Sequence, residues 1–281
     1  DDKNPLHDES LFDIESYPAE MWAKPGTTQP NRAGFAKWGS YINSYCQEKY
    51  GRPLFMVCSA DLAGSTNISG FGDSFGDMKN TGWYNRETNT DGVILPQGIT
   101  EFTNAGIMVG AASVNMAQDP ENDFNGFYTA SSTYGSFSYL KYGAMRLYSQ
   151  MAQDCELQLG KTIWVAGHSG PETAEDSRTH FGIFSPAATQ LFPDGHVINI
   201  HPWEFNEVPV MLAAAMQTES PIIALHLTRP GVEIPDREAL GLGSYKDAAK
   251  GAYILRAYKD DMPKHGVIMV QGTMSTYNLI N

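Results

Sequence analysis

Three short polar clusters in this 281-residue sequence carry acids, hydroxyls and histidines that could do chemistry. The clusters are Ser59–Ser65, Gly98–Phe102 and Gly167–His180, and the last has two histidines with an acidic pair between them. Such groups exchange protons and hold polar substrates by hydrogen bonds. Each cluster lies at the end of an apolar segment, and open α/β sheets hold ligands at strand ends and in the loops that follow. We therefore predict a ligand site built from these clusters.

Glu101 is the candidate proton donor of the second cluster, because the segment after its first turn contains only small and apolar residues. A carboxyl in apolar surroundings has a raised pKa, since its ionised form is disfavoured, and it could exchange a proton near neutral pH. An acid in the first turn of a helix is also common, because the helix dipole favours a negative charge there. Composition alone leaves both interpretations open.

The three motifs, in this order, resemble the pyrimidine-binding domain of the transketolase family. Gly98–Met108 follows the family's pattern closely, and Ser59–Ala63 is nearly the family's own string. The resemblance implies that Glu101 contacts the N1′ nitrogen of the aminopyrimidine of thiamine diphosphate. Protonation of that nitrogen favours the 4′-imino tautomer, which removes the C2 proton of the thiazolium to give the ylid.

The resemblance implies further cofactor contacts. It places Asp61 near the cationic thiazolium and Ser65 at a substrate phosphate, although an aspartate at this point is also typical of a turn. Tyr134 and Phe137 fall where two family phenylalanines form a slot for the aminopyrimidine ring, and Leu140 falls where the family usually has a tyrosine. Aromatic residues at this spacing are also common in protein cores.

The third cluster resembles the substrate channel of the family. The resemblance implies that His168 binds the acceptor's phosphate, Asp176 a sugar hydroxyl and His180 the donor's C1 hydroxyl. The catalytic candidates are Glu101, His168 and His180. The usual Gly-Pro before the second histidine is replaced by Ser177 and Arg178. The histidines are twelve residues apart, too far for a local metal pair, and surface histidines without a ligand are the alternative interpretation.

Two arginines complete the predicted substrate site. Arg229 follows the last predicted strand and looks like the family's strand-end arginine for phosphate, and Arg32 is the candidate for a second one. A guanidinium suits phosphate because its planar fork binds two oxygens. The serine that the family has three residues after this second arginine is Phe35 here.

Strands alternating with helices predict an α/β fold with a doubly wound, mostly parallel sheet. We expect residues 64–97 to form a long loop, and a helix starting at Glu101 that is buried all round because it is apolar all round. The predicted strands are residues 53–58, 161–167, 197–201 and 221–228. The predicted helices are residues 33–50, 101–116, 138–152 and 204–216.

The sequence divides into three parts. Residues 1–30 are rich in proline and acid and are expected to be a linker or an arm over another domain's surface. Residues 31–235 are the predicted pyrimidine-binding domain. Residues 236–281 are expected to be a linker and the incomplete start of a C-terminal transketolase-like α/β domain, with a strand at 266–271.

Composition limits the partners and the compartment. The net charge of −13 argues against nucleic acid, which requires a basic footprint, and simple solubility also explains the acidity. No apolar run approaches the roughly 18 residues of a membrane helix, and the first residues lack the features of a signal peptide. Three cysteines without framework spacing are typical of reduced thiols. We expect a cytoplasmic protein without a membrane partner.

The family's diphosphate-binding domain, with its metal ligands, has no counterpart in this sequence. The resemblance therefore implies half of an active site that forms between subunits of a homo- or hetero-oligomer. Thiamine diphosphate would be shared with a partner chain or domain, and Mg²⁺ or Ca²⁺ would be bound by that partner, with no metal bound by this chain. The implied reaction is two-carbon ketol transfer between sugar phosphates. The alternative is a non-catalytic transketolase-like subunit that regulates or scaffolds. The enzyme is favoured because five motif residues are present together, namely Asp61, Glu101, His168, Asp176 and His180.

Overall fold

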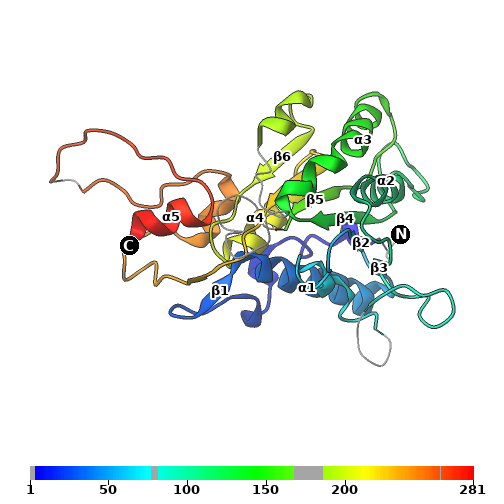
Figure 1. The fold of residues 1–281 in the computed structure, drawn as a ribbon, viewed down its shortest axis with the longest axis horizontal. Helices are drawn as coiled ribbons and strands as arrows, with labels where there is room; N and C mark the ends of the chain where they lie inside the picture. Colours follow the sequence, from blue (N-terminus) through cyan, green and yellow to red (C-terminus); the bar gives the residue numbers. More distant parts are fainter. Residues whose placement is uncertain (1–3, 77–81, 168–185, 260) are drawn as a thin grey trace.

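A six-stranded parallel sheet forms the centre of the computed structural model, which describes residues 4–76, 82–167, 186–259 and 261–281 (Figure 1). The order of its strands is β3-β2-β4-β5-β7-β6, and every neighbouring pair is parallel. This confirms the predicted doubly wound, mostly parallel α/β fold. The strands are β2 (Phe55–Ser59), β3 (Ile94–Leu95), β4 (Tyr128–Thr133), β5 (Thr162–Ala166), β6 (Val197–Ile200) and β7 (Ile222–His226).

Helices cover both faces of the sheet because strand residues point alternately to opposite sides. In β5, Ile163 and Val165 belong to a core shared with α1 and α4, whereas Trp164 and Ala166 belong to a core shared with α2 and α3. The helices are α1 (Asn31–Tyr50), α2 (Glu101–Ala112), α3 (Tyr142–Asp154), α4 (Glu207–Met216) and α5 (Thr273–Ile280).

The predicted element positions agree with the structure over most of the chain, and three differences have physical causes. The strand β4 was not predicted, because its sequence YTASST is hydroxyl-rich; the hydroxyls of Thr129, Ser132 and Thr133 are hydrogen-bonded within the core, as between Thr129 and Thr162 at 3.0 Å. The predicted strand at 266–271 is wrong: among the described residues no strand pairs with that segment, and the helix α5 follows it. The helix α2 ends at Ala112, four residues before the predicted end.

The prediction that the helix starting at Glu101 is buried all round is also wrong. Its inner side, including Ala105 and Met108, packs on the sheet, but Phe102 is 56% exposed and Ile107 lies at the surface as well. A sheet and one neighbouring helix, α3, cover only part of a helical surface. The chain therefore presents an apolar helix face to its surroundings.

The N-terminal segment packs against the core of this domain. It contains three 3₁₀ helices and buries Leu11 and Met21 beside α1. The Asp8 carboxylate accepts hydrogen bonds from Tyr45, Lys49 and Tyr50 of α1, each at 2.7 Å. Burial alone would raise the pKa of Asp8, but these bonds lower it well below its usual range. The 3₁₀ helices are Pro5–His7, Ile14–Ser16 and Ala19–Met21.

A short antiparallel pair joins distant parts of the chain outside the main sheet. The strand β1 (Thr28–Pro30) pairs with β8 (Gly231–Glu233), so the residues before α1 lie beside those after β7. The C-terminal part then continues through the 3₁₀ helix Tyr245–Lys250 and a long extended segment to α5 (Figure 1).

Candidate active site

A cluster of buried hydroxyls joins the carboxyl ends of β2 and β4. The side chains of Ser59, Thr66 and Ser132 lie within 2.8 to 3.1 Å of one another. The loop after β5 starts against this cluster: the Gly167 N–H donates to the Thr133 carbonyl at 2.6 Å, and a Cβ at this glycine would lie only 3.1 Å from the nearest Thr66 side-chain atom. The first cluster and Gly167, the one described residue of the third, therefore lie at the same edge of the sheet.

Glu101 lies at the same edge, at the first residue of α2. Its side chain is buried, with the residue 7% exposed, and its Oε1 accepts a hydrogen bond from the Thr133 hydroxyl at 3.0 Å. Gly98, with a φ of 80°, turns the chain into the helix, and its carbonyl accepts from the Asn104 side chain at 3.2 Å. The carboxyl of the second cluster is thus fixed at the end of β4.

The three predicted slot residues share one side of a short helix. Gly135–Lys141 is a 3₁₀ helix, which has about three residues per turn, so Tyr134, Phe137 and Leu140 follow one another along one face. Tyr134 is buried, and its hydroxyl lies 2.9 Å from the Ser65 hydroxyl. Leu140 at the other end is 56% exposed. The face therefore runs from Ser65 out to the surface.

The predicted phosphate arginines approach this edge from the start of α1 and the end of β7. Arg32 Nη1 donates to the Ser65 carbonyl at 2.7 Å. Its neighbour Asn31 accepts from the Thr228 N–H at 2.8 Å, one residue before Arg229. The hydrogen bonds of Asn31 thus bring the chain segments of both arginines together.

Asp61 and the histidine cluster complete the predicted set. Asp61 Oδ1 accepts from the N–H of Leu62 at 2.6 Å, within the tight turn that carries Ser65. His168, Asp176 and His180 lie outside the described residues.

A buried lysine beneath the site was not predicted from the sequence. Lys141 is the last residue of the 3₁₀ helix, and its Nζ donates to the carbonyls of Ser131 and Val165 at 2.7 and 3.3 Å. Burial lowers the pKa of this amine to about 7, while Cys58 and Glu101 act in the opposite direction. No sequence signal marks it, because burial of a lysine is a property of the tertiary structure.

A pair of histidines at the ends of β6 and β7 was also not predicted. The rings of His201 and His226 stack with centroids 3.9 Å apart, and Nε2 of His226 lies 3.2 Å from Oδ1 of Asn199. Burial lowers the pKa of His201 to about 4 and that of His226 to about 3, with His201 adding to the effect on His226. Both rings are therefore neutral at physiological pH.

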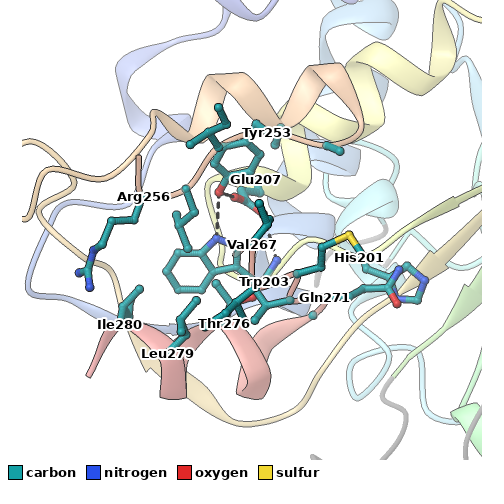
Figure 2. A pocket seen from close by; sticks show the side chains of 18 of the residues that line it. His201, Trp203, Glu207, Tyr253, Arg256, Val267, Gln271, Thr276, Leu279 and Ile280 are labelled. Carbon is teal, nitrogen blue, oxygen red and sulfur yellow. Dashed lines mark hydrogen bonds between the residues drawn. The ribbon is translucent and has the colours of Figure 1, made fainter. Parts of the chain in front are cut away.

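The large cavity of the chain lies elsewhere, between α4, α5 and the extended C-terminal segment (Figure 2). It has a volume of about 930 Å³. Trp203 donates to the Tyr253 hydroxyl at 3.1 Å, and that hydroxyl donates to Glu207 at 2.5 Å, as the dashed lines in Figure 2 show. The exposed residues Val267 and Met269 also line this cavity. None of the predicted site residues that the structure describes lines it, so we do not place the active site there.

Within the described parts of the chain, no group of three or more acidic, histidine or cysteine side chains could hold a metal ion. The helices described here also include none that is long and apolar enough to span a membrane.

The family model for the transketolase pyrimidine-binding domain matches residues 41–233. The chain belongs to this family. No curated protein matches the sequence. The family match covers β2 to β8 and contains Glu101, the hydroxyl cluster and the face formed by Tyr134, Phe137 and Leu140.

Solved transketolases show the same fold as this chain. A transketolase from Pichia stipitis is 20% identical with a TM-score of 0.63, and the match covers 90% of this chain and 32% of that one. The enzyme from Campylobacter jejuni is 20% identical with a TM-score of 0.56, covering 81% and 30%. The one from Leishmania mexicana is 17% identical with a TM-score of 0.57, covering 84% and 30%. The chain thus spans about a third of the length of these transketolases.

Proposed function

We propose that this chain supplies the pyrimidine half of a thiamine diphosphate site in a transketolase-type enzyme, which transfers a two-carbon ketol unit between sugar phosphates. The observation that carries this proposal is the position of Glu101. The buried carboxyl of Glu101 stands at the end of β4, on a helix that packs against the 3₁₀ helix with the face of Tyr134, Phe137 and Leu140. A flat heteroaromatic ring with one basic nitrogen fits such a combination.

The donor set suits the aminopyrimidine part of thiamine diphosphate and not its diphosphate. Phe137 and Leu140 offer apolar surface for a ring, and Glu101 offers one carboxyl for a ring nitrogen. When bound, the cofactor supplies the electron sink for carbanion chemistry, and the protein supplies orientation and electrostatics. Glu101 would hold or give a proton at N1′, and Asp61 would lie near the positive thiazolium.

The substrate end of the site would take the phosphorylated sugars. Arg32 and Ser65 contact each other at the end of the slot face, and Arg229 follows the strand end that Asn31 ties to the same helix. We assign phosphate binding to these three residues and to His168, and sugar hydroxyls to Asp176 and His180. One of the Pichia stipitis structures, 20% identical with a TM-score of 0.59, is a complex of transketolase with sedoheptulose-7-phosphate, which supports a ligand of this class.

A partner must complete the site, and the apolar surface of α2 and α3 suits one. Ile99 is 83% exposed, Phe102 56% and Leu147 64%, and α2 packs directly on α3 and on the 3₁₀ helix that carries the slot face. Exposed apolar patches of this kind mark protein interfaces. We place the diphosphate-binding half, with its Mg²⁺ or Ca²⁺, on a partner chain or domain in a homo- or hetero-oligomer, and the assembly in the cytoplasm.

Thiamine diphosphate titration of the chain, alone and with the partner, tests this half-site. Calorimetry in the presence of Mg²⁺ should give weak binding to the isolated chain and tight binding to the assembly, because the diphosphate and metal ligands are on the partner. Tight binding by the isolated chain would refute the half-site.

Transfer of a two-carbon unit from a ketose phosphate to an aldose phosphate, measured on the loaded assembly, then tests the reaction. A loaded assembly without transfer would leave the regulatory or scaffolding subunit as the function.

A further inference from the structure

Lys141 is among the largest fully buried side chains that the structure describes. Lysine is almost never buried without a partner. Its Nζ donates to two backbone carbonyls, Ser131 of β4 and Val165 of β5, on neighbouring strands. A neutral amine has two N–H donors and an ammonium has three, so these two bonds can persist in either protonation state.

Lys141 and Glu101 contact the same strand from the same side of the sheet. The carboxyl of Glu101 accepts from Thr133, and the amine of Lys141 donates to Ser131, two residues earlier in β4. Residues two apart in a strand point to the same face and lie roughly 7 Å apart. Here that face is covered by α2 and α3, and Glu101 begins α2 while Lys141 immediately precedes α3. The two groups are thus placed to interact through a buried, low-dielectric region.

Among the described residues, two titratable groups act on the Lys141 amine, namely Cys58 of β2 and Glu101 of α2. The Cys58 thiol donates to the Asn104 carbonyl at 3.7 Å, and burial raises its pKa to about 12. It therefore stays neutral near pH 7. Glu101 remains as the group that can balance a buried ammonium.

We propose that Lys141 is a positioning residue for Glu101, whose buried amine carries the counter-charge of that carboxylate. A negative charge on Glu101 favours the protonated amine, and the ammonium in turn supplies a positive charge on the same side of β4 as the carboxyl. For the reaction, which rests on the proposed function, Lys141 thus sets the electrostatic surroundings of Glu101.

A lysine titration followed by NMR tests the coupling on the full chain without any cofactor. With ¹³Cε-labelled lysine, one signal should titrate near pH 7, as burial of Lys141 predicts, and it should be absent from Lys141→Met, or from Lys141→Gln if the first variant does not fold. Glu101→Gln removes the counter-charge and should lower the midpoint of that signal by about one pH unit. Glu101→Asp keeps the charge and should leave the midpoint closer to that of the wild type.

Lys161 provides an internal control. Its Nζ also donates to two backbone carbonyls, those of Thr218 and Ser220, and burial lowers its pKa to about 8, but the carboxylate that acts on it is Glu219. Its midpoint should not respond to Glu101→Gln. An unmoved Lys141 midpoint, or equal shifts of both lysines, would overturn the proposal.

The catalytic consequence is measured separately in the assembled enzyme. Lys141→Met should still catalyse exchange of the C2 proton of bound thiamine diphosphate, with an altered pH profile, whereas Glu101→Gln should lose exchange at every pH. A coupled lysine titration combined with full exchange in Glu101→Gln would refute the function and leave the coupling intact. An unmoved titration combined with lost exchange would do the reverse.

Discussion

Two buried acidic sites in this chain are built in opposite ways. Glu204 and Glu207 at the start of α4 are both held by Arg237, at 2.8 and 3.0 Å. The carboxyl of Glu101, at the start of α2, accepts a hydrogen bond from the Thr133 hydroxyl and forms no ion pair within the described part of the chain. Arg237 ties both of its carboxyls into one buried network that contributes to structure, whereas Glu101 is tied to a hydroxyl and, as proposed above, serves the chemistry. The comparison therefore sets a stabilising site beside a proposed chemical one.

The largest effect that sharpens this comparison is expected for Glu101→Gln. Glutamine keeps the shape and a hydrogen-bonding group but cannot deliver a proton. Exchange of the C2 proton of bound thiamine diphosphate in heavy water should slow by roughly 10²–10⁴-fold in the assembled enzyme, while fold and assembly persist. Equal exchange rates for wild type and variant would eliminate Glu101 as the activating residue.

Arg237→Met should have the next largest effect, and on stability instead of chemistry. It leaves two buried carboxyls without their cation, which typically costs about 3–5 kcal/mol of the free energy of unfolding. Urea unfolding measures this loss. Lys246→Ala is the matched control, because the ion pair of Lys246 with Glu15 is largely exposed and should be worth less than about 1 kcal/mol. Similar losses in both variants would contradict the assignment of Arg237 as the stabilising centre.

Phe102→Ser tests whether the apolar face next to Glu101 binds the partner. An anchor residue at an interface contributes about 2 kcal/mol or more, which corresponds to roughly 30-fold in the dissociation constant of the assembly. Analytical ultracentrifugation or calorimetry measures that constant. Met262→Ser, an equally exposed apolar side chain in the C-terminal segment, is the control and should have little effect. If both variants assemble like the wild type, the partner binds elsewhere.

The smallest expected effect is a pH dependence at Glu204. Burial raises its pKa to about 7 although Arg237 acts in the opposite direction. A carboxyl that holds its proton more tightly in the folded state stabilises the fold below its unfolded pKa, and this contribution is lost as the pH rises through about 7. The free energy of unfolding should therefore fall between about pH 5 and 7, and Glu204→Gln should flatten that slope. An unchanged slope would show that Arg237 keeps Glu204 ionised throughout.

The fold and the arrangement of the site were largely predictable from the sequence. Apolar runs that end in polar residues indicate where strands end, and the carboxyl ends of parallel strands meet at one edge, where Ser59 contacts Thr66 and Glu101 contacts Thr133. The strand β4 escaped prediction because most of its hydroxyls find their partners only in the folded state. The apolar run at 266–271 predicts a strand from composition, but a strand also needs a neighbour, which the described residues do not supply.

The burial of charged side chains could not be predicted from the sequence either. Lys141, Arg237, Glu204 and Glu207 look like ordinary surface residues in the sequence, because only tertiary packing removes them from water. The exposed face of α2 is the opposite case, because its apolar residues predict burial and yet lie at the surface. An apolar composition indicates that a surface will be covered, but not by which chain.

The pairing of β1 with β8 has a consequence for how this domain can be joined to others. Thr28 lies opposite Glu233, so the chain comes into the domain and leaves it at neighbouring points, although more than 200 residues separate them. The flanking segments stay together beyond that point, since the Trp22 and Tyr245 rings are 5.2 Å apart. Domains whose ends adjoin tolerate insertion into a longer chain. A transplant of this domain into a host loop would therefore place both junctions side by side, and it would have to carry the N-terminal segment, whose Leu11 and Met21 are buried beside α1.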